Sequence, residues 1–406
     1  MEALPRACDV LVVGAGPAGS ACAQMLARAG LDVRIADRHA FPRDKVCGDG
    51  LIPDALRALE RLGVLGEVLG RARPVGHVSC IGSRGGRVDV PGTLAVLPRR
   101  ELDAIVLRAA ERAGARWLPP ARFEAPLVDA AGRVEGARLV IDGRPHELRA
   151  RWVVLATGAA LPPLLAAGLA ERREPSGIAL RGYIEHPGLA DRITTLQIVW
   201  HRRLAGGYGW IFPLPGGSGR FNIGAGATGR MVARGANLRT LFDAFCGLHA
   251  DARELVAGGR WLGRLEGAPL RCSLAGARWS RPGLLATGEA IGSTYAFTGE
   301  GIGKAMATGM MAADAIAAAP PAAATAEADD AGVRARYDAA LRALKPRFDL
   351  YQKAEHVNRR PWLTDLVIWR GQRSPRILRR MSGVLDETQN PGNLLSWRGI
   401  GRLLFE

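Results

Sequence analysis

Residues 9–19, DVLVVGAGPAG, decide the fold class of this chain. The stretch begins with an apolar, mostly β-branched run that predicts a buried β-strand. Gly14, Gly16 and Gly19 follow in the spacing G-x-G-x-x-G, at the start of a helical pattern. A second strand pattern then ends at an acid, Asp37. Strand, glycine turn, helix, strand and terminal acid in this order predict a Rossmann-like dinucleotide-binding unit.

Each residue of this unit has a physical role toward a dinucleotide. Gly14 allows the tight turn, Gly16 lets the backbone approach a diphosphate, and Gly19 lets helix and strand pack closely. The N-terminus of the helix, which contains Ala18, faces the phosphates. Asp37 can accept a hydrogen bond from a ribose hydroxyl of either NAD or FAD. The unit alone therefore leaves the choice of dinucleotide open.

Length and composition limit the class of protein. With 406 residues the chain is long for one core, so two or three sub-domains are expected. The chain is 48% hydrophobic and 23% charged, as in soluble globular proteins. The six cysteines show neither C-x-x-C pairing nor metal-ligand spacing. They favour a reduced, cytoplasmic compartment and no metal site, and the first residues do not resemble a signal peptide.

The formal net charge of +16 has two readings. Arginine-rich composition alone can account for it. Anionic partners can also account for it: a cofactor diphosphate, a phosphorylated or carrier-bound substrate, or an acidic membrane surface. Nucleic acid is not an expected partner, because the arginines are spread along the chain without an aromatic-interleaved basic motif.

Later segments indicate that the dinucleotide-binding domain is interrupted. Residues 151–159, RWVVLATGA, run from a strand into a glycine turn, and residues 283–316 run from a strand through a loop into a helix. Between residues 177 and 264 helical periodicity fades and four strand-like runs predict an inserted antiparallel sheet. The predicted fold is α/β: a Rossmann-like domain with a mixed parallel sheet, an inserted antiparallel sheet and a helical C-terminal tail.

Four stretches resemble the geranylgeranyl reductase family of FAD-dependent oxidoreductases, within the hydroxylase-like two-dinucleotide flavoprotein fold. They are GAGPAGS (14–20), PRDKVCGDG (42–50), GYGWIFP (207–213) and G-E-A…TGEGIGKA (288–305), and the tail motif PGNLLSWRGIGRLLF (391–405) is similar too. Three features depart from the family pattern. Thr157 stands where many relatives have Asp, Glu289 stands where Asp is usual, and ten residues separate Pro213 from Gly224, more than is usual.

The resemblance implies FAD as the cofactor and assigns a set of residues to it. In the resembling fold the helix after residues 299–301 points its N-terminus at the flavin, where it would stabilise negative charge on the reduced ring. The expected cofactor-binding residues are Gly14, Gly16, Ala18, Gly19, Asp37, Cys47, Gly48, Arg99, Gly288, Glu289, Gly299, Gly301 and Ile302. For Arg99 an ordinary solvated arginine is the alternative, and for Glu300 an acid that merely favours a helix start.

Lys45 and Cys47 are the candidate catalytic residues. By resemblance their loop lies beside the flavin ring. Lys45 is one of four lysines in a chain with fifty-one arginines, which hints that a compact ammonium is needed there. Lys304, in the other flavin motif, is a second such lysine. Chance placement of the lysines and a buried, inert cysteine remain the alternative.

Tyr208, Trp210 and Phe212 alternate along GYGWIFP, so on a strand all three side chains share one face. They are expected either to form sheet core or to line a tunnel for a long apolar substrate, as the resemblance implies. The expected segments are 1–75, 99–176 and 265–318 for FAD binding, 76–98 and 177–264 for the substrate domain, 319–332 as an Ala/Pro linker and 333–406 as a basic helical tail.

The tail holds fifteen arginine or lysine residues against seven acids, and PWLTDLVIW adds two tryptophans among aliphatic residues. Peripheral contact with an anionic membrane is one interpretation, and a helical cap with solvated arginines is the other.

The leading hypothesis is a reductase that saturates carbon–carbon double bonds of a prenyl or other polyunsaturated chain, with hydride from flavin N5. NAD(P)H or a small redox carrier is the expected electron donor. A flavin monooxygenase or halogenase on the same fold is the alternative. A non-redox flavin-dependent isomerase or cyclase, or a flavin-bearing partner protein, is a third. Substrate identity, pathway and oligomeric state are not determined by the sequence.

Overall fold

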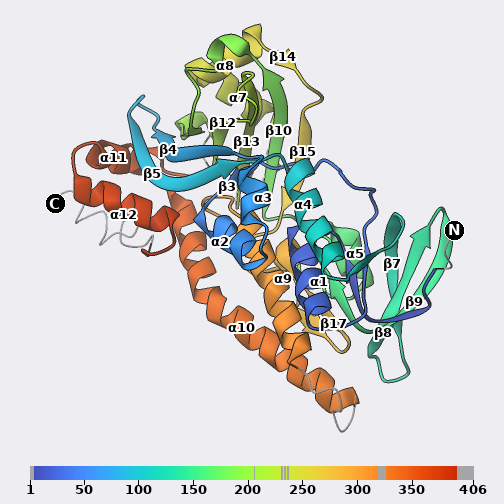
Figure 1. Ribbon diagram of the computed structural model, residues 1–406. Coiled ribbons are helices and arrows are strands. Elements are labelled where there is room, and N and C mark those ends of the chain that lie inside the picture. Colours follow the sequence, from blue (N-terminus) through green and yellow to red (C-terminus); the bar gives the residue numbers. More distant parts are fainter. Residues whose placement is uncertain are drawn as a thin grey trace.

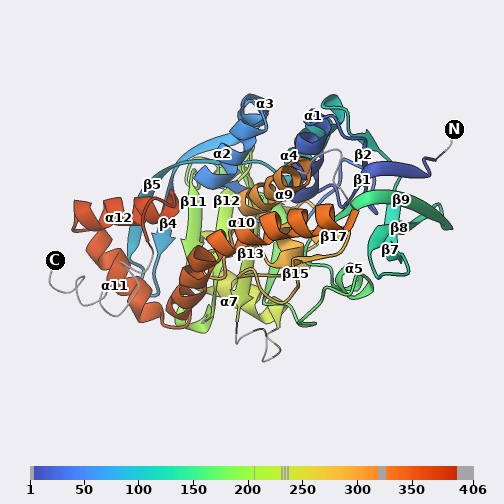
Figure 2. The ribbon, with the colours of Figure 1, turned by 90° about the horizontal axis from the view of Figure 1, so that it is seen from below.

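The computed structural model describes residues 4–204, 206–229, 232, 235, 237–318 and 326–390, with the backbone alone for residues 326–329. The tail motif at 391–405 lies outside these residues. Two mixed β-sheets of the described residues lie next to each other, and the long helix α10 (Ala326–Ala354) runs along one side of the molecule (Figures 1 and 2). The predicted α/β class with an inserted sheet and a helical tail is confirmed.

The first sheet contains the dinucleotide-binding unit. The first strand pairs in parallel with strands on both sides, and its last four residues are buried, as expected for a strand covered on both faces. The sheet has the order β16-β17-β9-β1-β2-β6, with β7 and β8 continuing from β9. Its strands are β1 (Ala7–Val13), β2 (Val33–Ala36), β6 (Arg116–Trp117), β7 (Ala121–Val128), β8 (Val134–Ile141), β9 (Arg144–Leu155), β16 (Ser280–Arg281) and β17 (Leu284–Ala286).

Segments far apart in sequence meet at this sheet. The parallel pairing of β9 with both β1 and β17 places residues 151–159 and 283–286 beside the first glycine turn. Helix α1 (Pro17–Arg28) packs against α9 (Ile302–Ala317) and α4 (Arg99–Arg112). A Cβ at Gly309 would lie 2.1 Å from the Ala18 carbonyl oxygen, so glycine there lets α1 and α9 approach closely. The interrupted dinucleotide-binding domain is therefore one structural unit.

The second sheet is the inserted one. Its order is β14-β10-β13-β12-β11-β4-β5-β3, with β15 also paired to β10. All its pairings are antiparallel except that of β11 with β4. Its strands are β3 (Gly50–Leu51), β4 (Arg73–Ile81), β5 (Arg87–Val96), β10 (Gly177–Glu185), β11 (Leu196–Val199), β12 (Gly207–Pro213), β13 (Arg220–Thr228), β14 (Arg260–Trp261) and β15 (Glu266–Leu270).

The two faces of the second sheet have different neighbours. Helix α7 (Leu238–Leu248) covers one face, where a Cβ at Gly209 would lie 2.2 Å from the Phe245 ring. The alternate residues of β12 point to the opposite face, toward the first sheet and the tail helices. The remaining helices are α2 (Pro53–Arg61), α3 (Leu65–Leu69), α5 (Leu161–Ala166), α8 (Ala250–Gly258), α11 (Pro361–Gly371) and α12 (Pro375–Leu385).

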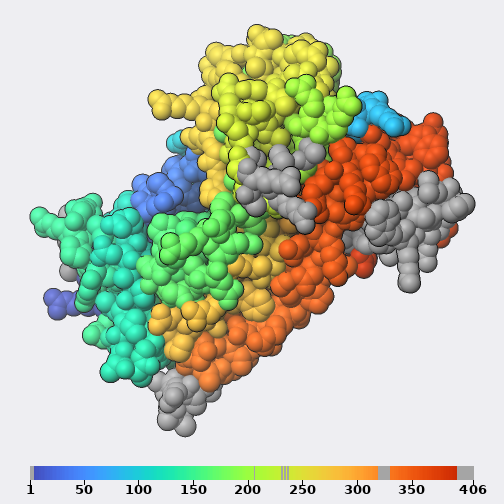
Figure 3. Space-filling view, turned by 180° about the vertical axis from the view of Figure 1, so that it is seen from behind, coloured from blue at the N-terminus to red at the C-terminus, as the bar shows by residue number. Residues whose placement is uncertain are grey.

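The tail helices join both sheets. Helix α10 begins at Ala326, inside the segment 319–332 that was expected to be a linker. Tyr337 of α10 is fully buried and donates a hydrogen bond to the carbonyl of Ala286 in β17, at 2.6 Å. Helices α11 and α12 pack on β5, and the tail follows the rear surface of the molecule as one continuous band (Figure 3). None of the described helices is long and apolar enough to cross a membrane.

Candidate active site

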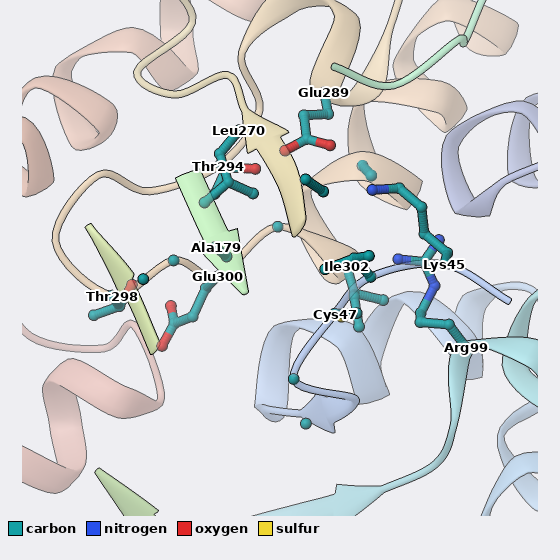
Figure 4. A pocket seen from close by; sticks show the side chains of 18 of the residues that line it. Lys45, Cys47, Arg99, Ala179, Leu270, Glu289, Thr294, Thr298, Glu300 and Ile302 are labelled. Carbon is teal, nitrogen blue, oxygen red and sulfur yellow. The ribbon is translucent and has the colours of Figure 1, made fainter. Parts of the chain in front are cut away.

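One cavity of about 800 Å³ runs between the two sheets and under the tail helices. At one end lie the glycine turn after β1 and Asp37. In the middle lie residues 44–50 and 297–303 (Figure 4). At the other end the lining is aliphatic and comes from β4, β5, β11, α11 and α12, with Val78, Val90, Ile198, Val367, Ile368 and Leu385. The expected substrate residues and most of the expected cofactor residues therefore border one space. Gly19 and Gly288 do not line it and instead allow close packing around the turns.

The glycine turn has the close contacts that its motif predicts. Gly14 has a φ of +104°, and a Cβ there would lie 2.3 Å from the Ala156 carbonyl oxygen. A Cβ at Gly19 would lie 1.8 Å from the Gly14 carbonyl oxygen. At Gly16, by contrast, the nearest atom to an added Cβ is a guanidinium nitrogen of Arg43 at 3.6 Å. The backbone at Gly16 thus borders open space, as the approach of a diphosphate requires.

Asp37 holds this turn in shape while facing the cavity. One carboxylate oxygen accepts the Ala15 N–H at 2.9 Å, and the other accepts the His39 N–H at 3.0 Å. Each oxygen keeps a lone pair for a further donor. Asp37 therefore fits the predicted role of accepting a ribose hydroxyl.

The turn after β17 contributes Glu289 to the same cavity. Gly288 has a φ of +66°, and a Cβ there would lie 2.6 Å from the Ala18 methyl group of α1. Figure 4 shows the Glu289 carboxyl pointing into the cavity, with the Lys45 side chain extending toward it. Burial raises the pKa of Glu289, and the Lys45 ammonium opposes that rise. The Thr157 hydroxyl is buried beside this space without a hydrogen-bond partner.

The polar groups along the cavity match the parts of an FAD molecule. The open backbone at Gly16, the acceptors on Asp37 and Glu289, and the unsatisfied Thr157 hydroxyl provide diphosphate, ribose and ribityl partners along one path. The start of α9, with Gly301 as its N-cap, lies further along the same cavity. The donor and acceptor set therefore fits a flavin dinucleotide, including at the two positions where this chain departs from the family pattern.

Arg99 is not a solvated arginine. Its side chain is buried at the start of α4 and donates two hydrogen bonds to Asp103, at 2.6 and 2.8 Å. Arg43 forms a second ion pair with Asp103 at 2.9 Å. Asp103 therefore fixes two guanidinium groups at the cavity wall, next to the Cys47 loop.

The loop that contains Lys45 and Cys47 is held by residues that the sequence motifs did not reveal. Asp49 is fully buried, with a φ of +66°. Its carboxylate accepts hydrogen bonds from the Tyr183 hydroxyl at 2.6 Å, the Asn222 amide at 2.8 Å and the Arg99 N–H at 3.2 Å. Burial raises the pKa of Asp49 to about 6 against these donors. An Asp between two glycines is a sequence signal for a residue with left-handed backbone conformation. No local sequence pattern indicates which residues form hydrogen bonds with its carboxylate.

Cys47 is shielded rather than activated. Its carbonyl accepts the Asn222 amide at 2.7 Å, and its sulfur accepts the Asp49 N–H at 3.4 Å. Burial raises the pKa of the Cys47 thiol above its usual value, although the Arg99 guanidinium lowers it. The neutral thiol is therefore favoured at neutral pH, and a thiolate nucleophile is not.

The aromatic residues of β12 line the cavity together. Ring centroids of Tyr208 and Trp210 are 6.2 Å apart, and those of Trp210 and Phe212 are 6.5 Å apart. The Trp210 indole N–H donates to the Asn222 side-chain oxygen at 2.9 Å. A Cβ at Gly224 would lie 2.2 Å from the Trp210 ring, so glycine there makes room for the indole. The prediction that the three aromatic side chains share one face is confirmed by this arrangement.

Lys304 takes a different position from Lys45. Its ammonium is buried among three carboxylates: Asp54 at 2.7 Å, Glu387 at 2.8 Å and Glu300 at 3.6 Å. Of the two charged residues in residues 299–305 of the late motif, Glu300 therefore lines the cavity and Lys304 does not.

Comparisons with known proteins agree with this geometry. A family model described as an FAD binding domain matches residues 7–178. The chain is 37% identical over 325 residues to a menaquinone reductase of Mycobacterium tuberculosis, covering 75% of this chain and 76% of that protein. It is 34% identical over 313 residues to digeranylgeranylglycerophospholipid reductase 1 of Methanopyrus kandleri, covering 75% and 79%.

Solved structures show the same fold at lower identity. A geranylgeranyl bacteriochlorophyll reductase-like protein from Thermoplasma acidophilum superposes with a TM-score of 0.73 over 99% of this chain and 97% of that one, at 21% identity. A flavin-dependent brominase superposes with a TM-score of 0.72 over 98% of each chain, at 18% identity. The fold is thus found in a reductase-like protein and in a halogenase, and the two sequence relatives described above carry reductase names. The chain belongs to the geranylgeranyl reductase family of FAD-dependent oxidoreductases.

Proposed function

We propose that this protein saturates carbon–carbon double bonds of a prenyl or similar polyunsaturated chain carried by a lipid or quinone. The observation that supports this proposal best is the continuity of the cavity. Its nucleotide end is continuous with the part lined by the aromatic strip of β12, which consists of Tyr208, Trp210 and Phe212. That part is continuous in turn with the aliphatic end under α11 and α12. Such a lining suits a long apolar chain that lies across the flavin and continues beyond it.

The names of the sequence relatives point the same way, since one acts on a digeranylgeranylglycerophospholipid and another on menaquinone. The polar end of the substrate, which we propose to be phosphorylated or carrier-bound, would remain outside the aliphatic part of the cavity. Charged residues of the described lining lie at the nucleotide end, with Asp37 and Arg43, and in the middle, with Lys45 and Glu300, and the lining contributed by β4, β5, β11, α11 and α12 is uncharged.

FAD, when bound, supplies the hydride chemistry. The residues of this chain bind and orient the cofactor and the substrate, and they exclude water from the site. The Asp49 and Asn222 network fixes the loop of Cys47, and the side chains of β12 hold the substrate chain against one face of the site. Buried aliphatic residues at the far end keep water from a bound chain. As electron donor we propose NAD(P)H or a small redox carrier.

Anaerobic reoxidation of the flavin tests this function. The protein is reduced with dithionite under nitrogen and mixed with a prenyl lipid or with its fully saturated analogue. We expect flavin absorbance to return with the prenyl lipid and to stay bleached with the saturated one. Absorbance that stays bleached with both lipids under nitrogen would contradict the proposal.

We also propose peripheral contact with an anionic membrane through α11. One side of this helix lines the cavity with Thr364, Val367 and Ile368, while Trp362 and Trp369 are 50% and 45% exposed. The Arg373 guanidinium lies 4.9 Å from the Trp369 ring centroid, so a basic group accompanies the exposed indole. Exposed indoles beside arginines suit the interface of a bilayer with acidic headgroups. A helix placed in this way would bring a membrane-borne substrate close to the aliphatic end.

Flotation with vesicles of phosphatidylglycerol and phosphatidylcholine tests the contact. The wild-type protein should float at low salt, and a double Trp362→Ser, Trp369→Ser variant should not. Leu262→Ser is the matched control, because Leu262 is also exposed but lies beyond β14 on the inserted sheet. Equal flotation of the double variant and the wild type would exclude this surface.

A further inference from the structure

A buried ionic cluster lies behind the cavity wall at the start of α9. Lys304 is its centre, and its ammonium lies within 4.0 Å of the carboxylates of Asp54, Glu300 and Glu387. Arg347 of α10 forms an ion pair with Glu387 at 3.1 Å. These groups come from α2, from the loop and first turns of α9, from α10 and from the residues after α12, so the cluster joins four parts of the fold.

The charges of this cluster do not balance when every group is ionised. Three carboxylates face two cations, and Arg347 is half exposed, which weakens its effect on the buried side. Lys304 makes its two shorter contacts with Asp54 and Glu387 and its longest with Glu300. A surplus negative charge in a buried site is removed most readily by protonation of the carboxylate with the weakest pairing. Glu300 is that carboxylate.

Glu300 is also the member of the cluster that borders the reaction space beside the flavin motif. Asp54 lines the cavity too, but its carboxylate is committed to Lys304 at 2.7 Å. Figure 4 shows Glu300 on the cavity wall beside Thr298, across the space from Cys47 and Lys45. Tyr208 of the aromatic strip donates its hydroxyl hydrogen bond to the Thr298 carbonyl at 2.5 Å, so the same loop contacts the substrate face.

We propose that Glu300 is the acid that supplies the proton when the substrate double bond is reduced, an inference that rests on the function proposed above. The π bond breaks as one carbon takes a hydride from the reduced flavin, which is oxidised, and the other carbon takes the proton of the Glu300 carboxyl. Two C–H bonds form, and Glu300 is left as a carboxylate 3.6 Å from the Lys304 ammonium, which stabilises it. A proton from water restores the acid before the next turnover.

The pH dependence follows from all groups that face Glu300. Burial raises the pKa of Glu300 to about 7; Lys304 opposes this rise, and Asp54 and Glu387 add to it. Tyr208 on β12, Tyr295 before α9 and Tyr351 on α10 also face Glu300, and all three phenols stay neutral because burial raises their pKa values. The protonated acid is present below this pKa and is lost above it, so the rate of reduction should fall as pH rises through about 7.

The test compares Glu300→Gln with Glu174→Gln, an exposed glutamate on the loop before β10. In single turnovers of the pre-reduced protein, the E300Q rate should fall by roughly 10²-fold or more and lose its pH dependence, as expected for loss of a general acid. Glu300→Asp, which keeps a carboxyl group, should retain part of the wild-type rate and part of its pH dependence. Asp54→Asn removes the negative charge of Asp54 beside Glu300. The pH at which the rate of reduction falls should therefore move to a lower value.

A second readout uses the flavin-free protein. Infrared difference spectra between pH 6 and pH 8 should contain, besides the signal of Asp49, whose pKa burial raises to about 6, a C=O stretch of a second protonated carboxyl. This second band should be present in the wild type and in E174Q and missing in E300Q. If E300Q reduces substrate within about twofold of the wild-type rate, or keeps both the band and the pH profile, the inference is wrong. If the wild-type protein itself reduces no prenyl substrate, the proposed function fails instead.

Discussion

Asn222 gives the sharpest test of how the site is held together. It is fully buried on β13 and makes three hydrogen bonds: to the Cys47 carbonyl at 2.7 Å, to Asp49 at 2.8 Å and from the Trp210 indole at 2.9 Å. It is thus the one side chain among those described that bonds to both the Cys47 loop and the β12 aromatic strip. Substitution to alanine removes all three bonds. The Trp210 indole N–H and the Cys47 carbonyl lose this partner, and Asp49 keeps only the bonds from Tyr183 and Arg99.

The expected cost follows from these contacts. Each neutral hydrogen bond contributes about 1 kcal/mol and the bond to the Asp49 carboxylate about 2 kcal/mol, so Asn222→Ala should destabilise the protein by about 4 kcal/mol. The matched control is Asn237→Ala. Asn237 is exposed and caps α7 through bonds from Arg239 and Thr240, so its loss should cost about 1 kcal/mol.

Equilibrium unfolding in urea of the flavin-free proteins measures both values. The N222A protein should also bind FAD more weakly, because the Cys47 loop loses its support, whereas N237A should bind it as the wild type does. If N222A loses no more free energy of unfolding than N237A does, then Asn222 does not link the Cys47 loop to the β12 aromatic strip in the way proposed.

Three further predictions concern the cofactor, the substrate and the thiol. Gly16→Ala places a methyl group in the space left for the diphosphate, so FAD affinity in a fluorescence titration should fall about tenfold or more, while Gly76→Ala, which also meets no close atom, should leave it unchanged. Ile198→Trp fills the aliphatic end of the cavity, so the rate with a long prenyl chain should fall roughly tenfold relative to a short one, and equal losses would contradict the placement. Because burial raises the pKa of Cys47, Cys47→Ser should keep turnover within about threefold, and complete loss would show that the sulfur is needed.

The parts of the fold that follow from local physics could be predicted from the sequence. The glycine turn after β1 is such a part, because Gly14 and Gly19 are required by contacts within a few residues or with the neighbouring strand. The strand runs of the inserted sheet were also predicted, and the run GIALRGYIE coincides with β10 (Gly177–Glu185). Alternation along β12 sufficed to place Tyr208, Trp210 and Phe212 on one face.

What could not be predicted depends on contacts between distant segments. Asn222 forms hydrogen bonds with Cys47 and Asp49, which lie more than 170 positions away in the sequence. No pattern in the sequence near Asn222 indicates that a polar side chain is needed there. The start of α10 lies in a stretch rich in alanine next to prolines, where composition suggested a linker and tertiary packing along α9 favours a helix. The sequence singled out Lys304 as unusual, but two of its three carboxylate partners, Asp54 and Glu387, come from segments that only the fold brings together.

The mass of the product is the most direct test of the central claim, that this cavity positions a polyunsaturated chain for reduction by FAD. The protein is reduced under nitrogen, mixed with a prenyl lipid, and the lipid is extracted for mass spectrometry. The account predicts a product heavier by two hydrogens for each double bond reduced. In heavy water both added atoms should be deuterium, because the N5 hydrogen of a dithionite-reduced flavin comes from the solvent. A lipid of unchanged mass under nitrogen, or a product heavier by one oxygen in a parallel reaction under air, would contradict it.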